Sequence, residues 1–105
     1  MLRGDVHRFR LPKGVGHEQS GDRFGVVVQA DELLPRSVVI VTPTSRSARA
    51  ASFRPEIEVR GEQTRVLVEQ VTPVDARRLG TRAGRLSAVE MWGVDMALAT
   101  VLGLD

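Results

Sequence analysis

The order of hydrophobic and polar residues in the first two thirds of the chain predicts a series of short β-strands. Residues 5–11 alternate between apolar and polar types, the period of two that is typical of a half-exposed strand. Runs rich in β-branched residues, such as Val26-Val27-Val28, indicate buried strands. Pro43 is expected to end the third strand because proline cannot donate to a β ladder. The predicted strands cover residues 5–11, 24–29, 38–41, 53–60 and 65–71, with a turn at Gly61-Glu62 between the last two.

The last part of the chain has the pattern of a helix. Ser87 and Glu90 have the spacing of a capping box, in which each side chain binds a backbone N–H of the first turn. Apolar residues then recur at helical spacing on more than one side: Met91, Val94, Leu98 and Val101, and also Trp92, Met96 and Ala99. We predict a helix over residues 88–102. Its extra apolar surface is covered either by its own core or by a second subunit or partner. A single helical turn is predicted over residues 74–79.

Several short strands followed by one helix predict a mainly β fold with a C-terminal α-helix, arranged as a small barrel or curled sheet. The length of 105 residues fits a single domain over 1–105. A domain this small has a thin core, so a second subunit would help to stabilise it. The chain has no cysteine, which excludes disulfides and thiolate metal sites and suits a reducing cytosol. No apolar run approaches the roughly 20 residues of a membrane helix, so we expect a cytoplasmic protein with no membrane partner.

The net charge of the chain is less informative than the type of its basic residues. The formal net charge is only +2, which does not by itself indicate a nucleic-acid partner. Lys13 is the only lysine among fifteen basic residues, and the others are arginines. The planar guanidinium matches two phosphate oxygens at once. A GC-rich genome would favour arginine codons equally well, so both explanations stay open.

The segment 12–23 is the first candidate site. It is a polar, glycine-rich loop that is long for a compact domain and leads into a buried strand. It contains His17, Glu18, Gln19 and Arg23, which are residue types suited to phosphate binding and proton transfer. A solvated loop with scattered polar residues is the structural alternative.

A second candidate site follows the predicted strand over residues 38–41. Thr44 and Ser45 carry hydroxyls that can bind a phosphate, and Arg46, Arg49 and Arg54 can follow an RNA backbone. Turn-forming hydroxyls and an exposed basic loop are the alternatives.

Metal and cofactor sites are not predicted. The only histidines, His7 and His17, lie on different segments, and no ligand spacing recurs. Neither a Gly-x-x-x-x-Gly-Lys loop nor a dinucleotide fingerprint is present.

Five motifs in order resemble the MazF/PemK toxin family over nearly the whole chain. They are Arg3-Gly4-Asp5; Gly16-His17-Glu18-Gln19 followed by Arg23; Pro43-Thr44-Ser45; Val68-Glu69-Gln70-Val71 with Val74-Asp75-Ala76-Arg77-Arg78-Leu79; and the helix that ends in Leu102-Gly103-Leu104. Two departures stand out. Phe24-Gly25 replaces the proline that usually follows the family's arginine. The Pro-x-Thr-Ser region is one residue short, so Ser45 competes with Thr44 for the same role.

The resemblance implies a fold, partners and an activity. The fold is the SH3-like small barrel with a C-terminal helix that MazF-like and CcdB-like toxins share, acting as a homodimer. The implied activity is sequence-specific cleavage of single-stranded RNA (mRNA, tRNA or rRNA) without a metal or cofactor, which would arrest translation and growth. A cognate MazE-like antitoxin is the implied inhibitor. Arg23 and Thr44 carry over as catalytic residues.

The expected chemistry uses the RNA's own 2′-hydroxyl as nucleophile. Arg23 would stabilise charge on the phosphate, and Thr44 or Ser45 would hold a second oxygen. Glu18 and His17 are both candidates for the base, and His17 is favoured as a residue that orients the substrate. The products would be a 2′,3′-cyclic phosphate and a 5′-hydroxyl. The alternatives are a CcdB-like toxin that binds a topoisomerase without cutting RNA, and an inactive SH3-like interaction module.

Overall fold

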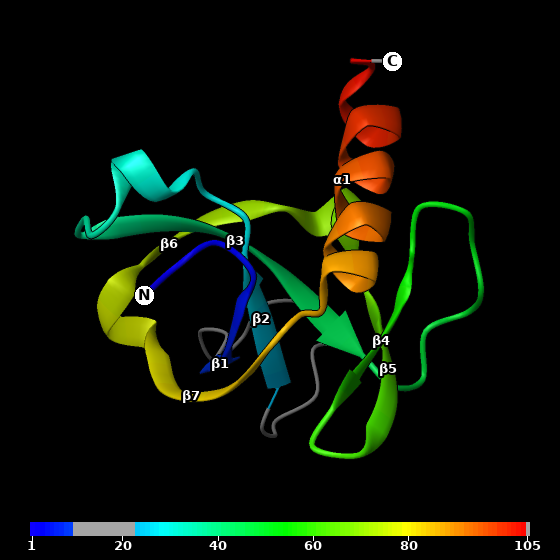
Figure 1. The fold of residues 1–105 in the computed structure, drawn as a ribbon, viewed down its shortest axis with the longest axis horizontal. Helices are drawn as coiled ribbons and strands as arrows, with labels where there is room; N and C mark the ends of the chain where they lie inside the picture. Colours follow the sequence, from blue (N-terminus) through cyan, green and yellow to red (C-terminus); the bar gives the residue numbers. More distant parts are fainter. Residues whose placement is uncertain (10–22, 105) are drawn as a thin grey trace, which may run out of the picture.

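The computed structural model describes residues 1–9 and 23–104. Along the chain the elements are β1 (Asp5–Phe9), β2 (Arg23–Val27), η1 (Asp31–Leu33), β3 (Val38–Ser45), β4 (Glu56–Val59), β5 (Glu62–Val66), η2 (Val68–Gln70), β6 (Thr72–Asp75), η3 (Ala76–Arg78), β7 (Leu79–Arg85) and α1 (Ala88–Leu102), where η marks a single 3-10 turn. The mainly β architecture with one C-terminal helix is therefore confirmed (Figure 1).

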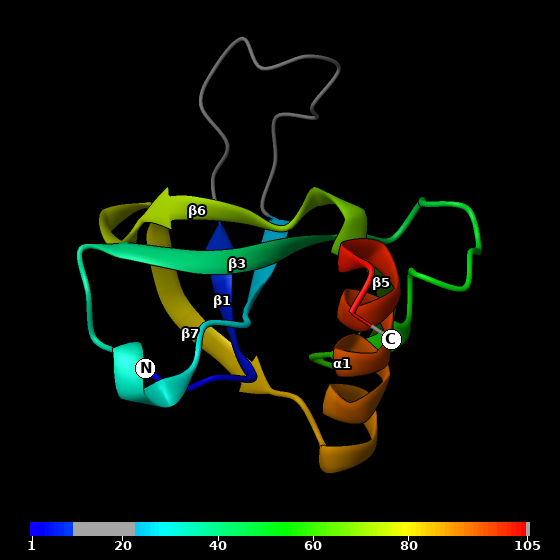
Figure 2. The same ribbon diagram turned by 90° about the horizontal axis from the view of Figure 1, so that it is seen from above.

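The strands form one curled antiparallel sheet. Its hydrogen-bonded order is β4-β5-β3-β2-β1-β7, and β6 pairs with the first half of β3. Figure 2 shows β3 and β6 side by side, with β7 curving away beyond β1, while α1 lies at the end of the molecule near β5. The sheet is a half-barrel, because β4 and β7 are the two ends of this order and are not paired in the part of the chain described.

The two faces of the sheet bury two separate apolar clusters. Alternate residues of a strand point to opposite faces, so neighbours in β2 go to different clusters. Val26 packs with Val66 and Val94 in the cluster beneath α1, whereas Val27 packs with Phe9 on the other face. β2 contributes to both clusters, and β3 contributes to the second cluster and pairs with β2, β5 and β6. Their ends are therefore rigid mounts for side chains.

Pro43 does not end its strand, contrary to the prediction from sequence. β3 continues to Ser45, and Pro43 lies opposite Gly25 of β2. The carbonyl of Pro43 accepts a hydrogen bond of 2.8 Å from the Leu67 N–H. The proline is tolerated because it takes part through its carbonyl, and its missing N–H is not required there. This longer β3 carries both candidate hydroxyls within the sheet.

The hairpin between β4 and β5 turns one residue earlier than predicted. Its two turn residues are Arg60 and Gly61, with φ of 52° and 82°, and Glu62 already belongs to β5. Two consecutive residues with positive φ match the right-handed twist of the flanking strands. Glu62 is thereby placed on a strand next to the second candidate site. The predicted strands over 53–60 and 65–71 are shorter than expected, since residues 68–70 form η2.

The strands β6 and β7 were missed by the sequence pattern. The predicted helical turn over residues 74–79 is confirmed only for the 3-10 turn η3. β7 is an edge strand whose residues are all exposed or half-buried, so it has no apolar alternation to recognise.

The helix α1 has the predicted bounds and capping box. The Ser87 hydroxyl accepts from the Glu90 N–H at 3.1 Å, and the Glu90 carboxylate accepts from the Ser87 N–H at 2.9 Å. Val94 and Ala97 are buried, whereas Val89, Trp92 and Met96 remain exposed. One side of the helix therefore enters the core of its own chain, and the other is exposed, so its cover by a second subunit or a partner stays a prediction. Among the described residues, no helix is long and apolar enough to cross a membrane.

Candidate functional site

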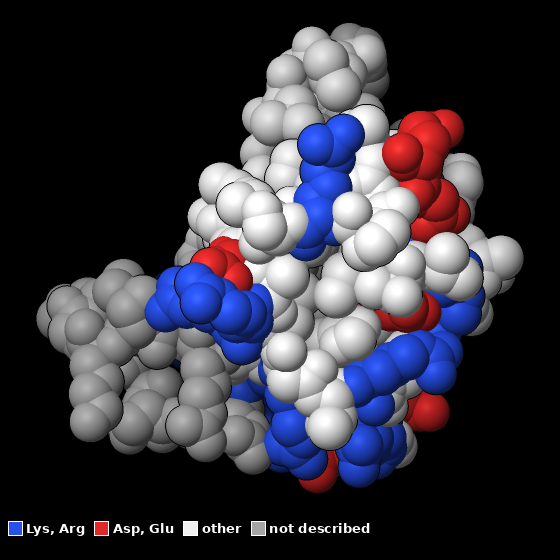
Figure 3. Space-filling model, turned by 90° about the vertical axis from the view of Figure 1, so that its left-hand side faces the viewer, with Lys and Arg blue, Asp and Glu red and all other residues white. Residues whose placement is uncertain are grey.

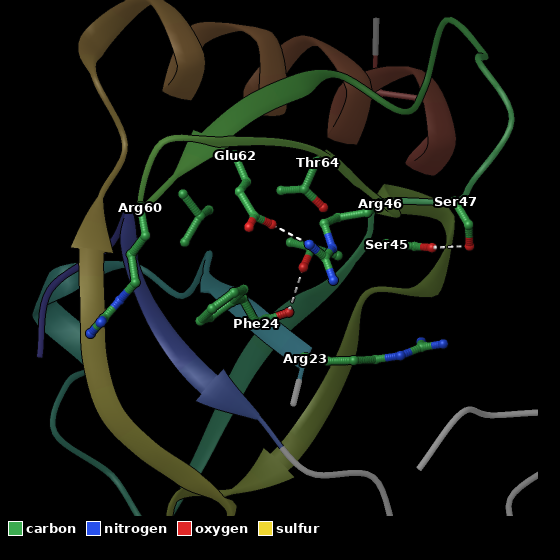
Figure 4. A pocket seen from close by; sticks show the side chains of 10 residues that line it. Arg23, Phe24, Ser45, Arg46, Ser47, Arg60, Glu62 and Thr64 are labelled. Carbon is green, nitrogen blue, oxygen red and sulfur yellow. Dashed lines mark hydrogen bonds and ion pairs between the residues drawn. The ribbon is translucent and has the colours of Figure 1, made fainter. Parts of the chain in front are cut away.

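A cavity of about 420 Å³ opens where β2 begins, beside the end of β3 and the β4–β5 hairpin. It is lined by Arg23, Phe24, Thr44, Ser45, Arg46, Ser47, Val59, Arg60, Glu62 and Thr64. Its volume falls within the range of sites that bind small ligands or parts of larger ones. The arginine of the first predicted site and the hydroxyls of the second therefore border one cavity (Figure 4). We call it the Arg23 cavity.

The strand register explains why Arg23 and Ser45 lie together. Gly25 is opposite Pro43 in the antiparallel pair of β2 and β3. Two residues further along both strands, at the start of β2 and the end of β3, stand Arg23 and Ser45. Residues opposite each other in such a pair point to the same face. In Figure 4 both side chains extend toward the same side of the site. A phosphate could lie between a guanidinium and a hydroxyl in this arrangement.

Thr44 is placed differently from Ser45, although both border the cavity. Thr44 is 2% exposed, and its hydroxyl donates a 3.1 Å hydrogen bond to the Phe24 carbonyl. Ser45 is half-buried, and its hydroxyl is 3.3 Å from that of Ser47. A phosphate oxygen needs a donor, and a hydroxyl has a single proton to give. Ser45 can thus offer its proton to a ligand more readily than Thr44.

The three arginines predicted to follow an RNA backbone have different surroundings. Arg46 lines the cavity and forms an ion pair with Glu62. Arg49 is exposed on the loop that follows β3. Arg54 donates two hydrogen bonds, of 2.9 and 2.6 Å, to one Glu69 oxygen, and it is only 25% exposed. Arg54 therefore fixes the loop after β3 to η2.

His17, Glu18 and Gln19 lie outside the described residues, so the structure does not place them relative to the cavity. The other histidine, His7, is on β1, where its Nδ1 is 3.0 Å from the Gly80 carbonyl oxygen. Within residues 1–9 and 23–104, no group of three or more metal-ligating side chains comes together.

Half of the residues that line the cavity were not predicted from the sequence. Phe24, Val59, Arg60, Glu62 and Thr64 line it but were not singled out. Four of the five come from the β4–β5 hairpin, which is far from Arg23 in the sequence. One signal was available: Thr64 stands two residues before the buried Val66, so it occupies an inward position of β5 with a polar side chain.

The charge of the cavity wall favours an anionic ligand. Three arginines line it against one glutamate. Basic side chains are not confined to this cavity: they also dominate the lower part of the face seen in Figure 3, where acidic side chains lie mostly at the margins. The local positive charge at the cavity is therefore more informative than the small net charge of the chain.

The fold is a small curled β sheet with one helix, and its cavity is basic and bears hydroxyls. Comparison with known proteins identifies the class of protein that has these features. The family model described as the PemK-like, MazF-like toxin of type II toxin–antitoxin systems matches residues 2–102. A candidate toxin of Mycobacterium tuberculosis is 42% identical over 106 residues, which cover 99% of each chain. The endoribonuclease MazF of Staphylococcus epidermidis is 32% identical over 98% of this chain and 92% of its own.

Solved structures show the same fold at lower sequence identity. An endoribonuclease in complex with its cognate antitoxin from a mycobacterial species superposes with a TM-score of 0.83, at 21% identity over 100% of this chain and 97% of the other. MazF from Deinococcus radiodurans gives a TM-score of 0.83, at 21% identity over 98% and 96% of the two chains. The chain therefore belongs to the PemK-like, MazF-like family of type II toxins, as its motifs indicated.

Proposed function

We propose that this MazF-like toxin is an endoribonuclease that cleaves single-stranded RNA at short sequences without a metal, using Arg23 and a neighbouring hydroxyl to hold the scissile phosphate. The observation that carries the proposal is the shared cavity of Arg23, Thr44 and Ser45. Family membership and the named endoribonucleases among the relatives support the same activity.

The proposed chemistry requires a phosphate-binding cavity, a base for the 2′-hydroxyl proton and a proton donor for the leaving 5′-oxygen. The RNA 2′-oxygen forms a bond to phosphorus and gives its proton to a base, while the bond from phosphorus to the 5′-oxygen breaks and that oxygen gains a proton. Negative charge increases on the phosphate oxygens as the new bond forms. A guanidinium already in place stabilises that charge without reorganisation at the moment of reaction, and such an effect is often the largest single contribution to rate. The products are a 2′,3′-cyclic phosphate and a 5′-hydroxyl.

The second oxygen contact falls to one hydroxyl of the Thr44-Ser45 pair. Ser45 is the better donor in the arrangement described, because Thr44 would first have to release the Phe24 carbonyl. Thr44 then has the role of fixing the start of β2 against β3. The proposed base is Glu18 or His17, and Gln19 is a further proposed substrate contact. All three lie outside the described part of the chain.

The RNA on either side of the phosphate would meet Arg46 and Arg49. Arg46 lines the cavity and Arg49 is exposed on the adjoining loop. Arg54 is already occupied by Glu69, so its contribution would be to hold that loop in place.

The proposed partners are an antitoxin and a second copy of the chain. One neighbour of the same fold is described as a complex with its cognate antitoxin and two others as MazE-MazF, which supports a cognate MazE-like antitoxin for this chain. The exposed side of α1, with Trp92 66% and Val89 79% exposed, supports a homodimer that would cover it. An RNA substrate would place the activity in the cytoplasm.

Cleavage of RNA in the presence of EDTA tests the proposed function. Purified protein should cut total RNA at defined short sequences with the chelator present. The Arg23→Ala variant should be about 100- to 1,000-fold slower, the loss typical of removing one preorganised charge contact. Arg36→Ala is the matched control, because Arg36 is exposed on the connector after η1 and lies outside the cavity. An intact, folded protein that leaves RNA uncut in EDTA would contradict the proposal and would favour a toxin that only binds a protein target.

A further inference from the structure

Thr64 is a buried polar side chain that lacks a partner within the described residues. It is 5% exposed and belongs to β5, where it lies opposite the buried Ile57 of β4 and two residues before the buried Val66. Within residues 1–9 and 23–104 its hydroxyl forms no hydrogen bond, although it lines the Arg23 cavity. Figure 4 shows the Thr64 side chain among the groups that line the cavity, together with Glu62 and Arg46. The hydroxyl oxygen is not among the fully enclosed polar atoms, so it can donate to or accept from a ligand group in the cavity.

Arg46 and Glu62 form an ion pair at the rim of the same cavity. Their side chains are 71% and 61% exposed, so both can rotate, and an exposed pair of this kind is weak. A planar ligand with matching hydrogen-bonding groups could separate them at little cost. Together with Thr64 they offer a cationic donor, an anionic acceptor and a hydroxyl.

The donor and acceptor pattern of this rim matches guanine better than the other bases. A carboxylate has two acceptor oxygens and binds best to two neighbouring donors. On guanine, N1–H and the N2 amino group are such neighbours, and O6 beside them is an acceptor that a guanidinium can bind. Adenine, cytosine and uracil each present at most one donor position on the corresponding edge.

Phe24 supplies an aromatic surface in the same cavity. Its ring is one of the lining groups, and the Arg8 guanidinium, which is not among them, lies 5.8 Å from the ring centroid. The ring also packs against the cluster beneath α1, so it is supported from outside the cavity. Aromatic side chains of this kind stack on unpaired bases of single-stranded RNA.

We propose that Phe24, Arg46, Glu62 and Thr64 form a guanine-binding subsite next to the scissile phosphate, with Glu62 as the residue that selects the base. The inference rests on the proposed function, because it makes Arg23 the neighbouring phosphate contact. Guanine stacks on Phe24, donates N1–H and N2–H to Glu62 and accepts at O6 from Arg46. The Thr64 hydroxyl gains a partner on the bound nucleotide.

Titration with nucleoside 3′,5′-bisphosphates tests the subsite without any cleavage. These probes carry one base and a phosphate on each side, and binding is followed by NMR shifts of the Glu62 and Thr64 amides. The guanosine compound should bind the wild type more tightly than its adenosine, cytidine and uridine counterparts. Inosine, which lacks the N2 amino group, should bind about 10-fold more weakly than guanosine. Glu62→Gln should lose about 5- to 150-fold of the guanosine affinity, and Thr64→Val about 5-fold.

Glu58→Gln is the matched control, because Glu58 is an exposed carboxylate on the same hairpin but outside the cavity. It should leave the order of the bases and the guanosine affinity unchanged. In RNA cut-site maps, the enrichment of guanine beside the cut should disappear in Glu62→Gln and persist in Glu58→Gln.

Equal affinities for the bisphosphates, or guanosine affinity unchanged in Glu62→Gln, would overturn the subsite while RNA cleavage in EDTA still supported the nuclease. Guanosine-selective binding that depends on Glu62, in a protein that leaves RNA uncut, would support the subsite and overturn the nuclease instead.

Discussion

At the scale of single residues, the sequence predicted three of the side chains that border the Arg23 cavity, because each belongs to a recognisable local motif. Arg23 was singled out from the loop motif and Thr44-Ser45 from the exit of a strand, and all three border one cavity. The choice between the two hydroxyls was not predictable. The choice depends on which hydroxyl is already hydrogen-bonded within the sheet, and this follows from the register of β2 and β3.

Removing the hydroxyl of Thr44 and removing that of Ser45 should have different effects on the cleavage rate and on stability. Ser45→Ala should lower the cleavage rate about 100-fold with little change in stability, because it removes a donor to the phosphate. Thr44→Val should lower the free energy of unfolding by about 1 kcal/mol, because the Phe24 carbonyl loses its donor. Its cleavage rate should change less than that of Ser45→Ala. Single-turnover rates and urea unfolding, measured on both variants, check the order. The reverse order of rates would give Thr44 the phosphate contact.

The motif Arg3-Gly4-Asp5 has a structural role. Asp5 is 5% exposed and accepts hydrogen bonds from the Leu2 N–H at 2.9 Å, from Arg85 at 2.9 Å and from Arg82 at 3.3 Å. Burial by itself raises the pKa of Asp5, but these donors outweigh it and hold the pKa below its usual value of 3.8. The motif therefore fastens the N-terminus to β7.

Asp5→Asn should lower the free energy of unfolding by about 1.5–3 kcal/mol at neutral pH, the range for hydrogen bonds to a charged group. Because the pKa of Asp5 is lower in the folded protein, its ionised form stabilises the fold above pH 3.8, and this contribution is lost as the pH falls through the folded value. The difference between wild type and variant should thus shrink below about pH 4. Urea unfolding at pH 7 and pH 3 checks it. An equal difference at both values would show that the charge is not involved.

At the scale of elements, local patterns succeeded where one face of an element is buried and failed at the edges of the sheet. The bounds of α1 follow from its capping box and its apolar spacing, both encoded within a few residues. The edge strand β7 is recognisable only from its partner β1, because its own residues are largely polar and exposed. Pro43 was wrongly predicted to end its strand for a related reason. Whether a backbone N–H is needed at this position depends on the neighbouring strands.

Ser87→Ala should destabilise the protein by about 1 kcal/mol, the usual cost of removing a helix N-cap. The Glu90 carboxylate that completes the box also accepts from the Glu58 N–H at 2.8 Å, so this cap connects α1 to β4. Thermal unfolding measures the loss, with Ser52→Ala as the control on an exposed turn. Equal melting temperatures for Ser87→Ala and the wild type would contradict the contribution of the cap.

At the scale of the whole molecule, the sheet brings the Arg23 cavity together from three separate parts of the chain. The start of β2, the end of β3 and the β4–β5 hairpin meet there because β3 pairs with both β2 and β5. Such long-range pairing is not readable from a single sequence, which explains why Glu62 and Thr64 were missed. The exposed apolar side of α1 is a second feature at this scale. The helical spacing of apolar residues alone predicted that α1 has more apolar surface than one side can bury.

Trp92→Glu should weaken the proposed dimer, because it places a charge in the middle of the exposed apolar side of α1. Sedimentation at micromolar concentration should give twice the 11.5 kDa chain mass for the wild type and a larger monomer fraction for the variant. Gln63→Glu, an equal change of charge at an exposed position of β5, should leave the dimer intact. A monomeric wild type, or a variant that dimerises equally well, would remove α1 from the interface.

The central claim is that Arg23 and an adjacent hydroxyl hold a phosphate while the RNA's own 2′-oxygen attacks it. The most direct measurement is cleavage, in EDTA, of an oligonucleotide that carries a single 2′-deoxy substitution at the mapped cut. The account predicts that this substitution blocks the cut, that a 2′-deoxy residue two positions away does not, and that the unmodified RNA yields 2′,3′-cyclic phosphate and 5′-hydroxyl ends. Cleavage that continues at the 2′-deoxy position, or ends bearing a 5′-phosphate, would contradict it.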